Sequence, residues 1–307
     1  MIRKPIEDEV IRKHLEHLPY DQREVFLLQH GTVRAVAVQG THMINQMRAN
    51  FNLGILETLA LGHGYLAGAL LAATVKGNDR VQLSIECGGP IKGLYVEAWA
   101  VGAVRGYLKQ VPIPIDKPLE SFDLSPFFGP GFLSVTKLLE GKKQPFTGQI
   151  MLRHGRIAKD LTEYFMISEQ TATAISLSIQ FDKEGRAVGA GALFLQKLPG
   201  AHDTDLEALE RMLDLMPSMG KYLSEGNTAK QYVQEVFAQA EPEYLGKEQL
   251  GFSCPCDRNR YAQYLGSLPD TEKSSILAEG PFPLKISCLN CATDYSFTKD
   301  ELQTILG

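Results

Sequence analysis

The 307-residue chain contains little tryptophan, few cysteines and no surplus of basic charge. One tryptophan and five cysteines accompany 31 Lys and Arg against 36 Asp and Glu, a formal net charge of −5. A general nucleic-acid binder needs excess basic charge to neutralise phosphates, so this balance argues against that class. With 44% hydrophobic and 22% charged residues, the composition also excludes a wholly disordered chain and allows a sizeable core.

Residues 1–18 contain no apolar segment and no small-residue cleavage site, so we expect no secretion signal. The strongest apolar stretch runs from Ile55 to Ala73 and contains Glu57, His63 and glycines at 62, 64 and 68. Lipid-spanning helices tolerate that mixture poorly, so we expect a buried helix instead. The sequence therefore predicts a soluble, cytoplasmic protein that binds neither membrane nor nucleic acid.

Several enzyme signatures are also missing. We find no P-loop, no nucleophile elbow and no His-Glu-x-x-His motif. The runs 62–64 (Gly-His-Gly) and 189–191 (Gly-Ala-Gly) resemble fragments of a dinucleotide loop, but neither lies between a strand and a helix as that loop requires. His63 and Glu57 are interpreted as polar groups on a helix and not as an acid–base pair. We predict that the protein is not an enzyme.

Four of the five cysteines gather in the last part of the chain, as Cys254-Pro-Cys256 and Cys288-Leu-Asn-Cys291. In a reducing compartment two close thiol pairs indicate a metal site more than a disulfide framework. Zn²⁺ takes four tetrahedral ligands and favours thiolate, and each pair places two sulfurs on one turn. All seven histidines lie upstream. We therefore predict one Zn²⁺ per chain, bound by Cys254, Cys256, Cys288 and Cys291.

Spacing alone leaves three roles open for this cluster: a purely structural zinc ribbon, a redox-responsive site, or a module that reads nucleic acid. The nearby basic residues Arg258, Arg260 and Lys285 are few for the last role. Cys87 ends an alternating strand pattern just before two glycines. We interpret it as a buried or half-buried structural residue, with a reactive thiol as the alternative.

Residues 1–200 are predicted to form one α+β domain of mostly antiparallel strands with packed helices. Alternating patterns and turn signals predict strands at 32–39, 80–87, 92–101, 131–138, 147–152, 174–181 and 187–198, with 104–108 continuing the sheet. Helical patterns cover 41–51, 53–75 and 157–167. The proline-rich stretch from Pro112 to Pro130 is interpreted as a connection.

Residues 201–248 are predicted to be an acidic helical linker, followed by a zinc-binding module at 249–307. Residues 201–250 hold ten acidic residues against four Lys and Arg, a net charge of −6. Apolar residues recur at helical spacing, with a break at 224–227. Ordinary helix packing explains this pattern, but an adaptable partner-binding surface is also open because methionines repack readily. The spaced residues are Leu206, Leu209, Leu213, Met216, Met219, Val233, Val236 and Phe237.

This order of parts resembles the redox-regulated heat-shock chaperones of about 33 kDa, an oxidation-activated holdase family. The likeness extends over nearly the full chain. After Cys256 the sequence departs from the family with Asp257-Arg258-Asn259-Arg260 in place of a Ser-Arg start, and Cys87 replaces a non-cysteine residue. The segments similar to the family are 67–77, 88–94, 104–107, 131–137, 146–148, 158–170 and 198–201.

The resemblance implies an ATP-independent holdase that is silent while reduced and zinc-bound. Oxidants would convert the site to Cys254–Cys256 and Cys288–Cys291 disulfides, zinc would leave, and the redox-switch domain and linker would unfold. The activated chaperone, expected as a homodimer, would then protect unfolding client proteins from aggregation under oxidative stress. An enzyme or an adaptor with a purely structural zinc ribbon is the alternative.

Overall fold

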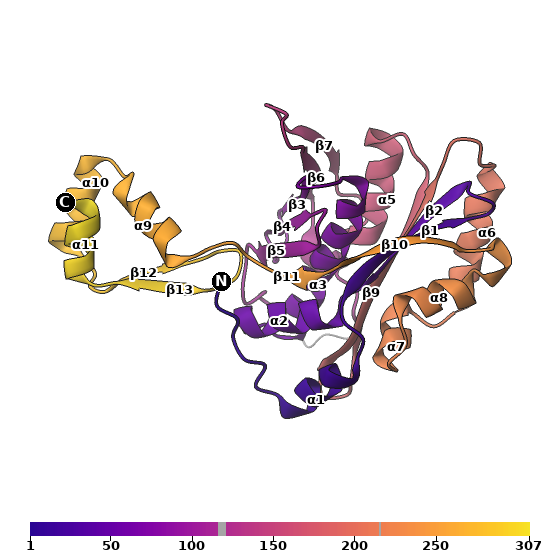
Figure 1. The fold of residues 1–307 in the computed structure, drawn as a ribbon, viewed down its shortest axis with the longest axis horizontal. Helices are drawn as coiled ribbons and strands as arrows, with labels where there is room; N and C mark the ends of the chain where they lie inside the picture. Colours follow the sequence, from indigo (N-terminus) through magenta and orange to yellow (C-terminus); the bar gives the residue numbers. More distant parts are fainter. Residues whose placement is uncertain (116–120, 215) are drawn as a thin grey trace.

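The computed structural model describes residues 1–115, 121–214 and 216–307 and has an α+β fold, as the sequence predicts. Within the described residues the strands form three sheets (Figure 1). A five-stranded sheet has the order β10-β1-β2-β9-β8, a six-stranded sheet the order β11-β5-β4-β3-β6-β7, and β12 pairs with β13. Every pairing is antiparallel except the short one between β11 and β5.

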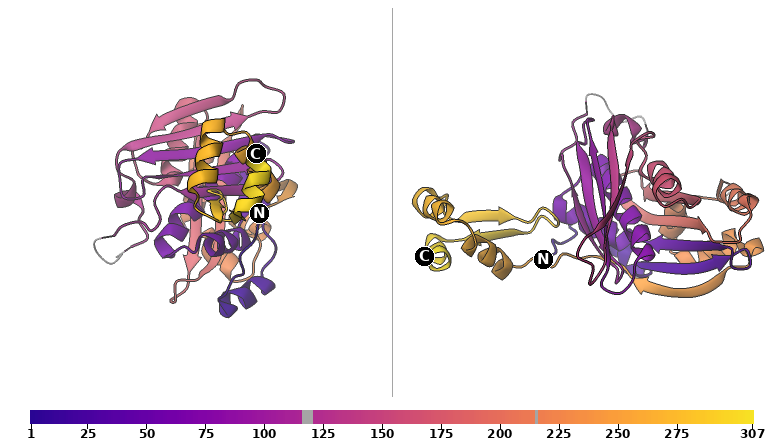
Figure 2. Two further views of the ribbon diagram at one scale, coloured as in Figure 1. Left: turned by 90° about the vertical axis from the view of Figure 1, so that its left-hand side faces the viewer. Right: turned by 90° about the horizontal axis from the view of Figure 1, so that it is seen from above.

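The six-stranded sheet follows the period-two pattern closely. In β3, Val81, Leu83 and Ile85 point into the core, whereas Gln82 and Ser84 lie on the opposite face. That outer face is turned toward the C-terminal module (Figure 2). Five of its strands are β3 (Arg80–Cys87), β4 (Gly93–Trp99), β5 (Ala103–Leu108), β6 (Gly131–Leu138) and β7 (Phe146–Met151), and the sixth is the short β11 (Gly251–Phe252).

A buried helix, α3 (Ile55–Leu71), lies between the two large sheets and packs on strands of both. All of its residues except Ile55 and His63 are buried. A Cβ at Gly68 would lie 2.8 Å from Val96 Cγ1, so the glycine lets α3 approach β4 closely. Ile55–Thr74 is long and apolar enough to cross a membrane, but 89% of its apolar 18-residue stretch is buried inside the protein.

The helices at 9–17, 41–51 and 157–168 pack against strands of the two large sheets. The predicted 41–51 helix matches α2, whereas the sequence analysis missed α1 and β1. Residues 116–120 of the predicted 112–130 connection lie outside the described residues, and α4 lies within the rest. The other helices and strands of residues 1–200 are α1 (Glu9–His17), β1 (Gln22–Leu28), β2 (Val33–Gln39), α2 (Thr41–Phe51), α4 (Ser125–Phe128), α5 (Ile157–Ser168), β8 (Thr173–Phe181) and β9 (Ala187–Lys197), with the 3₁₀ turn η1 (Ala72–Thr74).

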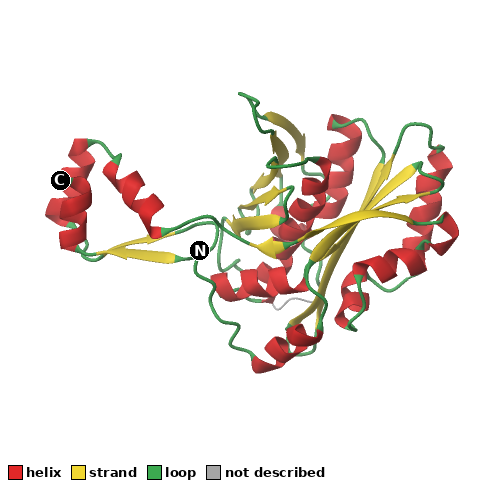
Figure 3. Ribbon diagram, in the orientation of Figure 1, coloured by secondary structure: helices red, strands yellow, loops and turns green. Residues whose placement is uncertain are grey.

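The acidic segment forms helices that dock on the outer face of the five-stranded sheet (Figure 3). Leu209, Val233 and Phe237 are buried against sheet residues such as Phe26 and Leu193. The segment therefore shares its core with the sheet. Its helices are α6 (Asp203–Asp214), α7 (Met219–Ser224) and α8 (Ala229–Val236), followed by the turn η2 (Ala238–Ala240).

The chain then changes character before the predicted linker ends at 248. β10 (Glu243–Gln249) pairs antiparallel with β1, and β11 (Gly251–Phe252) pairs with β5. A helical interpretation of 243–248 is therefore wrong, because the free edge of β1 supplies the hydrogen-bond partners that favour a strand there. We call residues 243–252 the strap, since they connect the docked helices with the C-terminal module across both sheets (Figure 1).

The C-terminal module stands apart from the main body in Figure 1. Leu265, Phe297 and Leu302 form its small apolar interior. Asp257 caps its first helix by accepting a hydrogen bond from the Arg260 backbone N–H at 2.9 Å. The module contains α9 (Arg258–Gly266), α10 (Asp270–Glu279), β12 (Leu284–Ser287), β13 (Asp294–Phe297) and α11 (Lys299–Leu306).

Candidate metal centre

The two cysteine pairs occupy two chain turns that face each other. Cys254 and Cys256 follow β11, whereas Cys288 and Cys291 lie in the tight connection between β12 and β13. In that connection the backbone N–H groups of Cys291 and Ala292 donate to Cys288 O at 3.3 and 2.8 Å. Ala292 adopts a left-handed φ of 51°. This compact turn presents both of its sulfurs on the same side of the β12–β13 hairpin.

The structure brings all four sulfurs together, as the spacing predicted. Cys254 Sγ lies 3.8 Å from Cys288 Sγ, Cys256 Sγ lies 3.3 Å from Cys291 Sγ, and all four atoms are within 4.8 Å of one another. A tetrahedral zinc site with Zn–S bonds of ~2.3 Å has sulfur separations of about 3.8 Å. All four residues are buried. The cluster therefore has the donors, spacing and shielding to bind a metal ion.

The protonation of the thiols indicates what such an ion would supply. Hydrogen bonds from Cys254 and Cys291 hold the pKa of Cys288 well below its usual value. Interactions with Cys254 and Cys288, together with burial, raise the pKa of Cys291 far above its usual value. A thiolate at Cys288 thus disfavours deprotonation of a second thiol, because the two negative charges would lie close together. A divalent cation is the group whose charge would allow all four sulfurs to be deprotonated together.

Two tyrosines and a threonine surround the sulfurs. Tyr295 OH donates to Cys256, 3.0 Å from its backbone oxygen and 3.2 Å from its Sγ. Burial and then the hydrogen bond to Cys288 raise the pKa of Tyr261, so this phenol remains a neutral donor. Thr293 Oγ1 lies 3.2 Å from Cys291 Sγ. Each contact supplies a polar partner to a sulfur that the module buries.

The main body reaches the cluster through two residues that sequence analysis missed. Arg105 Nη1, from β5, donates to Cys254 Sγ at 3.4 Å. Asn50 Nδ2, from α2, donates to Cys291 O at 2.9 Å. Arg105 was noted only as part of a family-like segment, and Asn50 carried no signal. Pairing of β11 with β5, which places Arg105 beside Cys254, is not visible in residue spacing.

The first residues of the chain also contact the cluster. Ile2 N donates to Thr293 Oγ1 at 3.1 Å, and the Met1 amino group donates to Cys256 O. Asn50 holds this segment as well, because its Nδ2 donates to Ile2 O at 3.0 Å. The two cysteine turns are therefore bonded to a strand, a helix and the N-terminal segment.

Cys87 lies elsewhere, half-buried at the end of β3 opposite Gly131. Burial raises the pKa of its thiol. Arg105 pairs with Glu97, which pairs with Gln82, so Cys87 lies two strands across and five residues along from Arg105. Strand geometry converts this offset to about 20 Å. The half-buried position agrees with the structural interpretation of Cys87.

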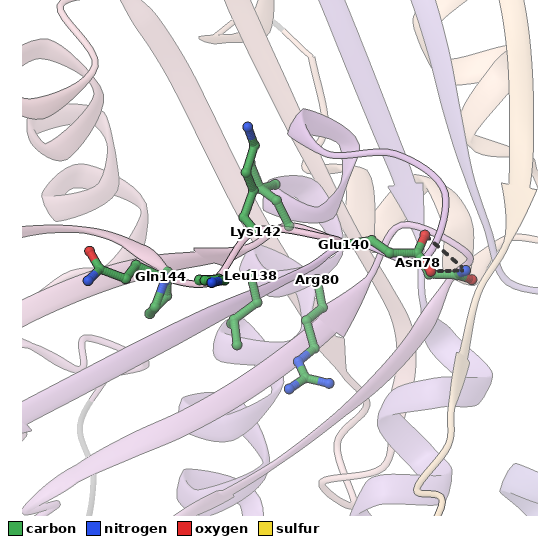
Figure 4. A pocket seen from close by; sticks show the side chains of 9 residues that line it. Asn78, Arg80, Leu138, Glu140, Lys142 and Gln144 are labelled. Atoms are coloured by element: carbon green, nitrogen blue, oxygen red, sulfur yellow. Dashed lines mark hydrogen bonds between the residues drawn. The ribbon is translucent and has the colours of Figure 1, made fainter.

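Two other polar groupings have structural explanations. His154, Asp160 and Glu163 lie close together, but the Asp160 carboxylate accepts backbone N–H groups of Arg153, His154 and Arg156 at 2.9–3.0 Å. A cavity of about 340 Å³ at the start of β3 is lined by Asn78, Arg80 and Glu140 among others (Figure 4). Asn78 Nδ2 donates to the Glu140 carboxylate there at 3.1 and 3.2 Å.

His63 and Glu57 also take the places expected of polar groups on a helix. Desolvation of the half-buried imidazole lowers the pKa of His63 to about 4, so the ring is neutral at physiological pH. Glu57 Oε1 accepts the backbone N–H of Ile113 at 2.8 Å. The Gly62 and Gly64 positions lie within α3, and Gly189 and Gly191 within β9, so neither run forms a strand-to-helix phosphate loop.

Two sheets around a buried helix, helices docked on the outer sheet face and a terminal four-cysteine module together define a chaperone class. Residues 21–298 match the family described as Hsp33 protein. The chain belongs to the Hsp33 family and is an Hsp33-type chaperone, a class whose partners are unfolded proteins.

Known relatives agree over nearly the whole length. The chain is 35% identical over 277 residues to the 33 kDa chaperonin of Desulforamulus reducens, covering 90% of this chain and 94% of that one. It is 32% identical over 276 residues to the 33 kDa chaperonin of Agathobacter rectalis, with coverage of 89% and 95%. The crystal structure of the Thermotoga maritima 33 kDa chaperonin superposes with a TM-score of 0.81 at 26% identity, covering 94% of this chain and 98% of that chain.

Proposed function

We propose that this protein is a redox-regulated, ATP-independent holdase. In the reduced protein Cys254, Cys256, Cys288 and Cys291 hold one Zn²⁺, and oxidation of these cysteines activates the chaperone. The observation that carries the proposal is the cluster itself: four buried sulfurs within 4.8 Å of one another, contributed by two separate turns. The state of these sulfurs decides whether the two turns stay together.

The energetics of the module support this dependence. At about 60 residues a domain is only marginally able to stabilise itself by its own core. A structural zinc site supplies an apparent ~10–16 kcal/mol, which in such modules is folding free energy. Helix α10 has no buried residue, and α9 buries only Leu265. We infer that loss of the ion unfolds the module.

Oxidation removes the ligands in a balanced reaction. Four thiolates, two molecules of hydrogen peroxide and four protons give two disulfides and four waters, so the sulfurs lose four electrons and each peroxide gains two. We propose Cys254–Cys256 and Cys288–Cys291 as the disulfides. These bonds close very short loops, which constrain the unfolded chain little, whereas cross-pairing would close loops of about 35 residues and hold the module together. Local pairing is therefore the pattern that permits unfolding.

The docked helices would respond next. The strap joins them to the cysteines without a break, and their apolar residues Leu209, Met219 and Phe237 are buried in the core that they share with the five-stranded sheet. Undocking would expose these side chains to unfolded clients. The acidic residues of the same segment, with a net charge of −6 over 201–250, would keep the exposed chain soluble.

We accordingly propose three functional units. Residues 1–200 are the chaperone core, 201–248 the regulated linker, and 249–307 the zinc-binding redox switch. The strap crosses the second boundary, which is consistent with a linker that follows the switch. We also propose that the protein works in the cytoplasm and that the activated form is a homodimer.

Light scattering of a chemically unfolded client tests the proposal. Protein treated with peroxide at elevated temperature should suppress aggregation in the absence of ATP, whereas reduced, zinc-loaded protein should not. Zinc content and free thiols are measured on the same samples, and we expect loss of one zinc and four thiols with the gain of activity. Equal activity in both states would indicate a constitutive chaperone. Zinc loss without activity would favour the alternative of an enzyme or adaptor with a structural zinc ribbon.

A further inference from the structure

The side chain of Arg105 connects the cysteine cluster to an ion-pair group on the outer face of the six-stranded sheet. Its Nη1 donates to Cys254 Sγ at 3.4 Å. Its Nε and Nη2 donate to Glu97 Oε2 at 2.8 and 2.5 Å. Glu97 is 2% exposed, so its position is fixed by the sheet. One guanidinium therefore contacts a fixed carboxylate of the main body and a sulfur of the module.

A second arginine shares the carboxylate but not the sulfur. Arg80 Nε forms an ion pair with Glu97 at 2.9 Å. Both guanidinium groups lie over the ring of Trp99, Arg105 at 5.0 Å and Arg80 at 5.7 Å from its centre. Two arginines and one carboxylate leave one positive charge in this group. The group of the module to which Arg105 donates is the Cys254 sulfur.

The charge of that sulfur differs between the two redox states. Four thiolates around one divalent cation carry a net charge of −2, whereas two disulfides are neutral. A thiolate is a charge-assisted acceptor for a guanidinium, and disulfide sulfur is a weak one. The contact between Arg105 and Cys254 is therefore favourable only in the state that the proposed function describes as inactive.

We infer that Arg105 is a positioning residue that docks the reduced module on the six-stranded sheet and releases it when Cys254 is oxidised. Glu97 orients the guanidinium of Arg105, and Arg105 donates the hydrogen bond to Cys254. The charge on Cys254 depends on the redox state of the cluster and sets the strength of that hydrogen bond. This inference rests on the proposed function, because it assigns a residue of the main body to the regulation of the same site.

The test compares Arg105→Gln with Arg80→Gln in the reduced, zinc-loaded full-length protein. Both substitutions remove one arginine from Glu97 and from Trp99, but only Arg105→Gln removes the contact with Cys254. The first readout is the rate of zinc transfer to a chromogenic chelator without oxidant. A lost charge-assisted hydrogen bond corresponds to roughly a tenfold change, so we expect transfer about tenfold faster in Arg105→Gln and less than about twofold faster in Arg80→Gln.

Trp99 supplies a second readout because it is the chain's single tryptophan. We expect peroxide to change its emission in the wild type and in Arg80→Gln, and we expect reduced Arg105→Gln to resemble the oxidised wild type already. If Arg105→Gln does not fold, Arg105→Lys takes its place, because lysine keeps a positive charge without the guanidinium fork. We expect Arg105→Lys to transfer zinc faster than the wild type and Arg80→Gln, but without losing its zinc completely. Circular dichroism establishes folding for each variant.

The outcomes separate this inference from the proposed function. Equal zinc transfer and equal emission in the two glutamine variants would overturn the role of Arg105, even if peroxide still activates the wild type. Faster zinc transfer in Arg105→Gln would support the docking role, even if no redox state of the protein suppresses client aggregation.

Discussion

Asn50 donates a hydrogen bond from Nδ2 to the main-chain oxygen of Cys291 at 2.9 Å, across 241 residues of sequence. Asn50 is completely buried, and its other partners include Ile2 O and the Lys4 backbone N–H. One amide thus fixes the second cysteine turn, the N-terminal segment and α2 relative to one another.

Asn50→Ala should therefore loosen the module without touching a sulfur. Leaving the Cys291 oxygen unpaired in a buried place should cost about 1–3 kcal/mol, with a corresponding increase in the rate of zinc transfer. The matched control is Gln46→Ala, since Gln46 contacts Lys4 and Asn50 but not Cys291. Thermal unfolding and chelator-monitored zinc transfer measure both variants. Identical behaviour of the two variants would contradict the assignment.

Cys288→Ser should abolish tight zinc binding. One of four thiolate ligands is lost, and we expect affinity to fall by more than about 100-fold because the ligands supply the binding energy jointly. Cys87→Ser should retain one zinc per chain and the response to peroxide, since Cys87 lies far from the cluster. Metal analysis after dialysis against a weak chelator distinguishes the two. A mixed disulfide of Cys87 with a cluster cysteine after mild oxidation would count against this separation.

Gly189→Ala should release the linker without oxidation. A Cβ at Gly189 would lie 2.0 Å from Gly220 O and 2.8 Å from Ser224 N, so α7 would have to move away from β9. Overpacking of this kind costs about 1–3 kcal/mol, which shifts the docking equilibrium roughly 5- to 150-fold. Gly251→Ala is the control, because no atom lies within 4 Å of its added Cβ. Hydrogen exchange of α7 and α8 in the reduced protein should rise only in Gly189→Ala.

The stability of the reduced protein should fall as pH rises above about 6.5. Both ring nitrogens of His42 face acceptors, Asp21 Oδ1 at 3.3 Å and Leu15 O at 3.0 Å. Burial opposes protonation of His42, but the hydrogen bond to Asp21 and its charge outweigh burial and raise the pKa of His42. Burial also raises the pKa of Asp21. A histidine whose pKa is raised in the folded protein contributes its full stabilisation below its unfolded-state pKa of about 6.5. That stabilisation is lost as the pH rises through the folded-state pKa.

Asp21→Asn tests this pH dependence because it removes the charge that keeps His42 protonated, while its one remaining oxygen can still accept one of the two backbone N–H groups, of His42 and Met43, that the carboxylate accepts. Melting temperatures between pH 6.5 and 8 should decline more steeply in the wild type than in the variant. Parallel curves for the two proteins would show that the pair does not contribute in this range.

Sequence patterns predicted those parts of the fold that depend on local order. The strand at 80–87 and the helix at 41–51 were placed correctly because their apolar periods and flanking turns are local properties. β1 was missed because Arg23 and Glu24 are buried within it and break the apolar alternation. β10 was missed because its sequence is polar and its partner, β1, decides its conformation.

The site shows the same division. The four cysteines were identified because each pair is adjacent in sequence and thiolate spacing itself indicates a metal. The contribution of Arg105 depends on β11 pairing with β5, which joins residues about 150 apart. No period in the sequence contains that information.

The strap has a consequence for colloidal behaviour. While β10 is in place, β1 is an interior strand whose backbone groups are paired on both sides. Departure of β10 would turn β1 into an edge, and an unpaired edge is a template on which other extended chains add. An active holdase would then offer a client unpaired backbone N–H and C=O groups as well as apolar side chains. The exposed edge of β1 would also allow two chaperone molecules to pair with each other. The concentration of clients relative to the chaperone would therefore decide which chain pairs with β1.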